Sequence, residues 1–376
     1  MKALVSAVVL SFTLTAAMGA AQGVDAGSPE GQMLGAISKE ADLAHKQAMM
    51  EEFVKTYPTS SQAGWAWEQL QSAYLQAQQY DRAVEAGEKA LAANADNPVL
   101  AYNNLKASEG KNDPDGVIKW SGETSRLARK TIDSAGKSGG ADAKGRAEYA
   151  QQLDSYSEYS IYALALKTTD PQKVIALSQS LEQRNPKSPY MGKLAGIYLN
   201  ALRQAGQNDQ VGPVSEKLLE TDPNSPDALF AAADYNMQHQ NMDKCLEYSS
   251  KLVQVMQQTP KPDGVSDADW QKRKNTMLGA GLWMQGLGYN SRRDFKQANT
   301  TLRQSLPLLQ DNKQLLGLSL FALGLADHSL GKAGNRAMMQ DALKYFQQSA
   351  ALTSPVQAQA QANVKAMRGV AGGRRR

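Results

Sequence analysis

The chain has 376 residues, enough for two or three ordinary domains or for one array of repeats. Hydrophobic residues make up 42% of it, which excludes a chain that is disordered throughout. The net charge is +4, but without Lys2, Arg368 and the three terminal arginines 36 basic residues remain against 37 acidic ones. This near-neutral body argues against a nucleic-acid groove, which needs clustered Lys and Arg.

The N-terminus has the pattern of a secretory signal. Lys2 precedes an apolar stretch over residues 3–15, and the small residues Gly19, Ala20 and Ala21 follow. We expect a signal peptide over 1–21, cleavage near Ala21, and a periplasmic or secreted mature protein; the alternative is a buried N-terminal helix. No later segment has the roughly 20 apolar residues of a membrane span, so none is expected.

The rest of the chain favours helix, since it is rich in Ala, Leu, Gln and Lys. Helical runs end repeatedly in a polar turn with proline, which cannot continue a helix. Four such endings are residues 55–58, 94–98, 184–186 and 221–223. Each ending predicts the close of one structural unit.

A second regularity precedes these turns. Residues spaced i, i+4 and i+7, which share one helical face, are repeatedly small or aliphatic. A face of this kind predicts close approach to a neighbouring helix. The sets are Ala83, Gly87 and Ala90; Val174, Ser178 and Leu181; Val211, Ser215 and Leu218; Cys245, Ser249 and Leu252; Ala298, Leu302 and Ser305; and Ala342, Phe346 and Ser349.

Each of these predicted helices has a partner upstream. Residues 282–289 contain Gly286, which leaves room for the second helix, and Tyr289, which fills the gap between the two. Further partners are Trp67, Leu70 and Tyr74; Met191, Leu194, Ala195 and Tyr198; and Leu320, Leu323 and Gly324. The unit is therefore a helix–turn–helix.

This unit resembles the tetratricopeptide (TPR) repeat, which has about 34 residues with Trp, Leu-Gly and Tyr on one helix and Ala, an aromatic, Ala and Pro on the next. The best matches are Trp67-Leu70-Tyr74-Ala83-Ala90 and Leu282-Gly286-Tyr289-Ala298-Ser305. Gln71 stands where the family has Gly, and Gly87 where it has an aromatic; Tyr102 to Asp133 matches weakly. The resemblance implies an all-α, right-handed α-solenoid of about six to seven helix–turn–helix repeats.

Composition divides the array. Residues 28–133 are expected to form N-terminal TPR-like repeats and 146–367 C-terminal ones. Residues 134–145, rich in Gly, Ala and Lys, are expected to be a flexible loop, either between two lobes or within one superhelix. Residues 368–376 are expected to be a disordered basic tail, whose Arg374–Arg376 could touch acidic surfaces weakly.

No pattern of catalytic or metal-binding residues is present in the sequence. The three histidines, His45, His239 and His328, belong to no zinc motif, and the single Cys245 is expected to be a buried thiol. No glycine-rich phosphate loop occurs in a strand–turn–helix context. We therefore expect no cofactor, no metal and no enzymatic activity.

In the TPR family the first helix of each repeat lines the concave face, and the resemblance carries this role to twelve residues. They would form an apolar, aromatic groove for a protein or peptide, of the kind that marks binding sites; the alternative is that they pack between repeats. The residues are Trp65, Tyr156, Tyr159, Phe230, Asp234, Met237, Trp283, Leu287, Asn290, Phe321, Leu325 and His328.

The leading hypothesis is an exported protein- or peptide-binding scaffold that uses this groove. The alternative is an accessory or assembly factor for a cell-envelope enzyme or export machine. An enzyme with a site in the groove is a weaker third hypothesis. Neither the partner nor its motif can be named from the sequence.

Overall fold

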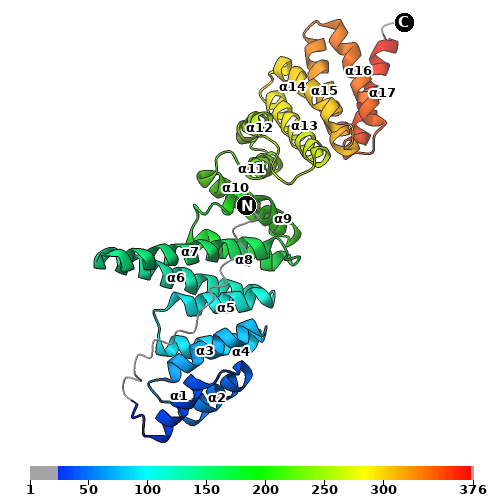
Figure 1. Cartoon of the computed structure of the whole chain (residues 1–376). Coiled ribbons are helices and arrows are strands. Elements are labelled where there is room, and N and C mark those ends of the chain that lie inside the picture. Colours follow the sequence, from blue (N-terminus) through cyan, green and yellow to red (C-terminus); the bar gives the residue numbers. More distant parts are fainter. Residues whose placement is uncertain (1–23, 374–376) are drawn as a thin grey trace. The chain divides into compact units, whose positions relative to one another are not determined.

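A computed structural model describes residues 24–373, which form α-helices, one 3₁₀ turn and, within that range, no strand (Figure 1). The chain divides into two compact units, Met1–Lys167 and Thr168–Arg376. The all-α prediction is therefore confirmed, and each unit is described separately below.

The first unit holds seven helices in its described part. They are α1 (Pro29–Lys39), α2 (Leu43–Thr56), α3 (Ala63–Gln76), α4 (Tyr80–Ala93), α5 (Pro98–Gly110), α6 (Pro114–Ser138) and α7 (Ala141–Ala165). Each helix packs against the next, and α3 also packs against α5, and α5 against α7. We call α1, α3, α5 and α7 first helices, and α2, α4 and α6 second helices.

The second unit repeats the arrangement. It contains α8 (Pro171–Arg184), α9 (Met191–Gln204), α10 (Asn208–Thr221), α11 (Pro226–Gln238), α12 (Met242–Gln258), α13 (Asp267–Ser291), α14 (Phe295–Ser305), the 3₁₀ turn Leu306–Leu309, α15 (Lys313–Lys332), α16 (Arg336–Ala350) and α17 (Gln357–Gly373). The first helices α9, α11, α13 and α15 contact one another in sequence, and the second helices are α8, α10, α12, α14 and α16. Helix pairs of the TPR kind are thus the building block of both units.

The small-residue face lies where the spacing predicts. All eighteen predicted positions on α4, α8, α10, α12, α14 and α16 are buried. Gly286 makes the room expected of it, since a Cβ there would lie 2.4 Å from Leu302 Cγ on α14. These positions bring the second helices close to the first helices beside them: Cys245 of α12 contacts the carbonyl of Met284 on α13, and Ser305 of α14 hydrogen-bonds to Ser319 on α15 at 2.5 Å.

The two departures from the family pattern, Gln71 and Gly87, compensate each other. The Gln71 amide is fully buried and donates to Leu100 O at 2.9 Å and to Asn104 Oδ1 at 2.8 Å, both on α5. A Cβ on Gly87 would lie only 2.2 Å from Gln71 Nε2 and from Asn104 Oδ1. The larger side chain of Gln71 on α3 is therefore accommodated by the missing side chain of Gly87 on α4. The Gln71 amide in turn links α3 to α5, two consecutive first helices.

Six of the three-residue turns inside the pairs share one geometry, which the sequence pattern does not predict. In these six turns the middle residue has a positive φ, and the next N–H donates to a carbonyl five residues back, which closes the first helix. Two of these residues are glycines, Gly206 and Gly334, but four are not: Gln78, Asn112, Gln240 and Arg293, with φ between 52° and 60°. The closing bonds of these four turns measure 2.8 to 3.0 Å.

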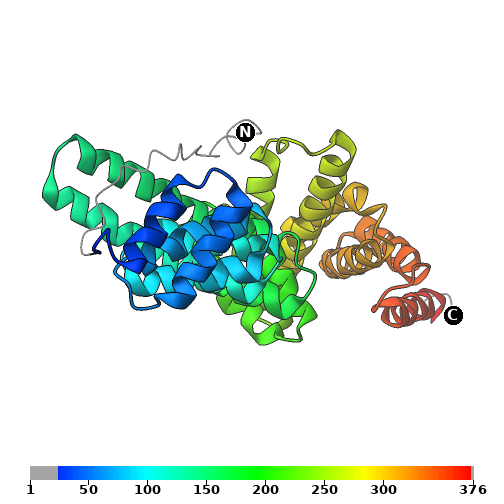
Figure 2. The same cartoon turned by 60° about the horizontal axis from the view of Figure 1, so that its bottom comes forward.

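The predicted flexible loop at 134–145 is wrong. Helices α6 and α7 have 25 residues each and form a hairpin that projects from the rest of the first unit, with a turn only at Gly139 and Gly140 (Figures 1 and 2). Ala135 and Ala143 are buried between the two helices. The division of the chain falls after Lys167, not in this segment, so the expected N-terminal range 28–133 is too short.

Both ends of the chain lie partly outside the described residues. The predicted signal peptide, 1–21, lies outside them, as do Arg374–Arg376. Residues 368–373, expected to be disordered, continue α17 instead.

Ion pairs connect consecutive second helices across the first helix between them. In the first unit Arg82 pairs with Glu51 at 3.0 Å and Lys119 with Glu88 at 2.6 Å. The second unit has the corresponding pairs Lys217–Glu182 at 3.2 Å, Lys244–Glu216 at 2.8 Å and Arg303–Asp341 at 3.0 Å. Partly exposed pairs contribute at most about 1 kcal/mol each, so packing remains the main stabilising term.

Candidate functional site

The first-helix face of the first unit carries a cluster of tyrosines. Tyr102 on α5 meets Tyr156 on α7 edge to face, with ring centroids 5.3 Å apart, and the Tyr159 ring lies 5.8 Å from Tyr156. All three side chains are half-buried. Helices α5 and α7 pack against each other, and this packing brings the tyrosines of the two helices together.

A charged pair holds the centre of this cluster. Lys106 donates to Glu109 at 2.6 Å and to the Tyr156 hydroxyl at 2.7 Å, and that hydroxyl contacts the Glu109 carboxylate at 2.9 Å. Burial, followed by the neighbouring Glu109 carboxylate, strongly raises the pKa of Tyr156. Tyr156 therefore stays protonated and works as a hydrogen-bonding aromatic, not as an acid or base.

Helix α3 extends the same face. Trp65 is 39% exposed, an unusual state for so large an apolar side chain. Glu68 lies one turn later on that side of α3, and burial raises the pKa of its carboxyl. Leu166, at the end of α7, is 52% exposed. The first helices of this unit thus carry two exposed apolar side chains, Trp65 and Leu166, as well as the half-buried tyrosines.

The first-helix face of the second unit is more tightly packed than expected. Phe230 and Met237 of α11 and Leu287 of α13 are only partly exposed, because they pack against the hydrophobic core. Trp283 is 9% exposed and belongs to that core, so its predicted position on an open groove is wrong. Its indole N–H finds no hydrogen-bond partner among the described residues.

Polar contacts also tie the first helices of this unit together. Arg203 of α9 lies 3.8 Å from Asp234 of α11, which also accepts from Gln238 at 3.0 Å. Asn290 of α13 donates to the carbonyl of Ala322 on α15 at 3.0 Å. The predicted site residues Asp234 and Asn290 therefore have structural partners within the unit.

The three candidates on α15 lie in different surroundings. Phe321 stacks obliquely on Phe346 of α16, with centroids 5.6 Å apart. Leu325 is 40% exposed. Burial, and then the neighbouring Lys332, lowers the pKa of His328, so its ring is neutral at physiological pH. Of the three, Leu325 is the one whose side chain is open to a partner.

Sequence reasoning missed Tyr102, Lys106 and Glu109. They lie in the segment that matches the TPR pattern weakly, because Ser108 replaces the usual aromatic of the first helix. Their i, i+4, i+7 spacing on one helix, with one aromatic and two opposite charges, is the signal that could have found them.

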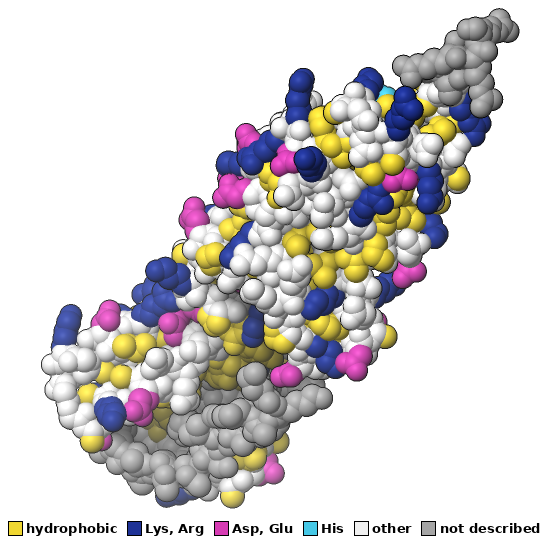
Figure 3. Space-filling view, turned by 90° about the horizontal axis from the view of Figure 1, so that it is seen from above, with side chains coloured by type: hydrophobic (Ala, Val, Ile, Leu, Met, Phe, Trp, Pro, Cys, Tyr) yellow, Lys and Arg dark blue, Asp and Glu magenta, His cyan; other side chains and the backbone are white. Residues whose placement is uncertain are grey.

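Charge is mixed on the surface. In the view of Figure 3, Lys and Arg are interspersed with Asp and Glu and form no single basic stripe. Within residues 24–373, no group of three or more His, Cys, Asp or Glu could hold a metal ion, and no helix is long and apolar enough to cross a membrane.

No protein-family model matches the chain, and neither does any curated protein. Among solved structures, it is similar to an assembly chaperone of RpL4 (Acl4, residues 1–338), with 13% identity over 82% of this chain and 99% of that one and a TM-score of 0.26. It is also similar to the P58(IPK) TPR domain, with 12% identity over 92% and 99% of the chains and a TM-score of 0.26. The third is the APC/C hetero-tetramer Cut9–Hcn1, with 13% identity over 91% and 84% and a TM-score of 0.25.

TM-scores this low carry no argument about what the chain binds. The class of fold, an all-α array of TPR-like helix pairs, rests on the helix pairs themselves and on their buried small residues.

Proposed function

We propose that the protein is an exported scaffold that binds a protein or peptide partner on the first-helix face of its first unit. The observation that carries this proposal is the half-exposed aromatic surface of Trp65, Tyr102, Tyr156 and Tyr159. Aromatic side chains lose little entropy on binding and dominate protein interfaces. The pair Lys106 and Glu109 fixes the Tyr156 ring in place before a partner arrives.

The second unit supports the proposal less strongly. Its first helices are joined by Arg203–Asp234 and by Asn290, and its large aromatic Trp283 is core. We therefore assign the principal contact surface to α3, α5 and α7, with Leu325 as a separate exposed position on α15.

Site-specific photo-crosslinking tests the surface. The crosslinking amino acid p-benzoylphenylalanine replaces Trp65 on α3 in one variant and the exposed Lys89 on α4, a second helix, in a control. We expect a defined partner to be captured at position 65 and not at 89. Equal capture at both positions would show that the first-helix face is not the binding surface.

A binding measurement with the captured partner then tests the aromatic contact. Trp65→Ala should weaken binding about tenfold or more, as truncation of an interface aromatic does, without lowering the thermal stability. The matched control is Leu43→Ala, which removes an apolar side chain that is 76% exposed on a second helix. Unchanged affinity of the Trp65 variant would refute the assignment.

Export is tested on the protein itself. Mass spectrometry of the chain recovered from the cell envelope and from the medium should find a mature N-terminus close to Gln22. A chain that retains Met1 to Ala21 in the cytoplasm would overturn this part of the proposal.

A further inference from the structure

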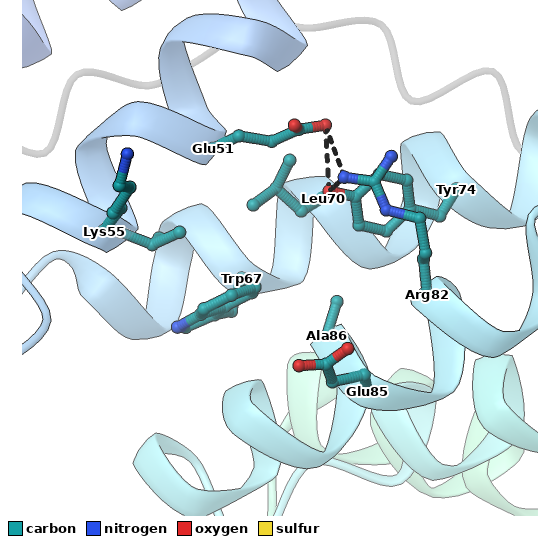
Figure 4. Close-up of a pocket in the computed structure, with 9 residues that line it drawn as sticks. Glu51, Lys55, Trp67, Leu70, Tyr74, Arg82, Glu85 and Ala86 are labelled. Carbon is teal, nitrogen blue, oxygen red and sulfur yellow. Dashed lines mark hydrogen bonds and ion pairs between the residues drawn. The ribbon is translucent and has the colours of Figure 1, made fainter.

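A pocket of about 220 Å³ opens on the side of the first unit that the second helices α2 and α4 line, with α3 between them (Figure 4). This is a different surface from the first-helix face. Its volume is several times the roughly 30 Å³ that one water molecule occupies. Leu70 and the rings of Trp67 and Tyr74 give it an apolar wall, and charged side chains of α2 and α4 surround the opening.

One end of the pocket is built from an arginine, an aromatic ring and a carboxylate. The guanidinium of Arg82 lies over the Tyr74 ring, 4.1 Å from its centroid. It also pairs with Glu51 at 3.0 Å and donates to the Tyr74 hydroxyl at 2.7 Å, and that hydroxyl donates to Glu51 at 2.9 Å. Cation–π contact and ion pairing therefore act on the same guanidinium.

The other end has an aromatic ring and a carboxylate as well. Trp67 is partly exposed there, and Glu85 extends from α4, with its carboxylate turned toward the side of the pocket that Trp67 occupies (Figure 4). Within the described part of the chain, Glu85 forms no ion pair, since the pairs of this region are Arg82–Glu51 and Lys55–Glu52. Lys55 also lines the pocket, but its side chain is 79% exposed and lies 3.7 Å from Glu52, so it leaves the Glu85 carboxylate unneutralised.

Charge complementarity selects the occupant. Glu51 pairs with Arg82, and Lys55 pairs with Glu52 outside the lining, so Glu85 is the carboxylate of the lining that has no cation of its own, and it lies on the side of the indole. A flat guanidinium suits this pair better than an ammonium does, because it stacks on the ring and donates to a carboxylate in a fork. We propose that this pocket receives an arginine side chain of a protein partner, stacked on Trp67 and paired with Glu85.

Nuclear magnetic resonance tests the pocket with a defined probe. The chain has five tryptophans, so its indole N–H signals are few, and Trp67→Phe identifies the one that belongs to Trp67. The probe is N-acetyl-arginine amide. The matched control is N-acetyl-citrulline amide, which has nearly the same shape without the charge. We expect the Trp67 signal to shift in a saturable manner with the arginine probe only.

Two variants separate the ion pair from non-specific attraction. Glu85→Gln keeps the shape of the exposed side chain and should weaken arginine binding about three- to fivefold, the effect of one partly exposed ion pair. Glu220→Gln, at an exposed position of α10 in the second unit, removes the same charge elsewhere and should have no effect. Circular dichroism confirms that both variants keep the helical fold.

Three results would overturn the proposal. They are an equal shift with the citrulline probe, an unchanged affinity in Glu85→Gln, or a Trp67 signal that fails to respond. Because the pocket and the first-helix face lie on different surfaces, loss of binding at Trp65 would leave this titration unchanged.

Discussion

The reciprocal exchange of Gln71 and Gly87 predicts that one substitution, glycine to alanine, has opposite effects on two neighbouring second helices. At Gly87 of α4 the new Cβ would lie 2.2 Å from two polar atoms of a buried amide pair. At Gly122 of α6 it would meet no atom within 4 Å.

The magnitudes follow from three terms. Alanine in place of glycine inside a helix gains about 1 kcal/mol at either site. At Gly87, overpacking costs about 1–3 kcal/mol, and separating the Gln71 and Asn104 amides leaves buried polar groups unsatisfied at about 1–3 kcal/mol. Gly87→Ala should thus lower the free energy of unfolding by about 1–5 kcal/mol, whereas Gly122→Ala should raise it by about 0.5–1 kcal/mol.

Urea unfolding followed by circular dichroism measures both variants. Because a chain with two compact units need not unfold in a single step, hydrogen exchange at α4 and α6 locates the change in the first unit. The double variant Gln71→Ala with Gly87→Ala should lose less stability than the sum of its single changes, since it returns space to the alanine. A Gly87→Ala protein as stable as the wild type, or a destabilised Gly122→Ala protein, would refute this account of the close contact.

Three further predictions concern the second unit. Trp283→Phe should change the free energy of unfolding by less than about 1.5 kcal/mol, because it removes an indole N–H that has no partner among the described residues. Trp283→Ala should lower the free energy of unfolding by about 3–5 kcal/mol in the same urea titration. A small loss in the alanine variant would show that Trp283 is not part of the core. Gln240→Gly should raise the thermal midpoint, with a gain of about 0.5–1 kcal/mol, because a side chain at a φ of 60° is strained; a lower midpoint would contradict it. Burial raises the pKa of Asp327, despite Asn299 and Arg303 beside it. Its folded pKa then exceeds the unfolded value, so its contribution to stability is present below the unfolded pKa and is lost as pH rises through the folded pKa. Asp327→Asn should flatten this fall, and an unchanged pH profile of the unfolding free energy would exclude Asp327 as its source.

Most of the fold could be predicted because its determinants are local. Proline in the turns and small residues at i, i+4 and i+7 act within one hairpin, and both features lie where they were expected. The segment 134–145 failed for a local reason too. Its glycine content predicts flexibility, but Gly136 and Gly145 lie inside α6 and α7, and Ala135 and Ala143, one on each helix, are buried in the hairpin.

The candidate site could be predicted only in part. Trp65 is exposed on α3 and Tyr156 and Tyr159 are half-buried on α7, and their role in binding stays a prediction. Register alone cannot tell how closely two first helices approach, and this approach buries Trp283 in one unit while Trp65 stays exposed in the other. The contacts of Lys106 with Tyr156 join residues fifty positions apart, which no local pattern specifies.

The exchange of Gln71 and Gly87 also limits which single helices can be exchanged between hairpins. In α13 and α14 the small residue, Gly286, is on the first helix and the large one, Leu302, is on the second, whereas α3 and α4 have the opposite order. A chimera that joined α3 to α14 would press Gln71 against Leu302, and one that joined α13 to α4 would face glycine with glycine across a void. Single helices of similar hairpins are therefore not interchangeable, because the helix that supplies the space differs from one pair to the next.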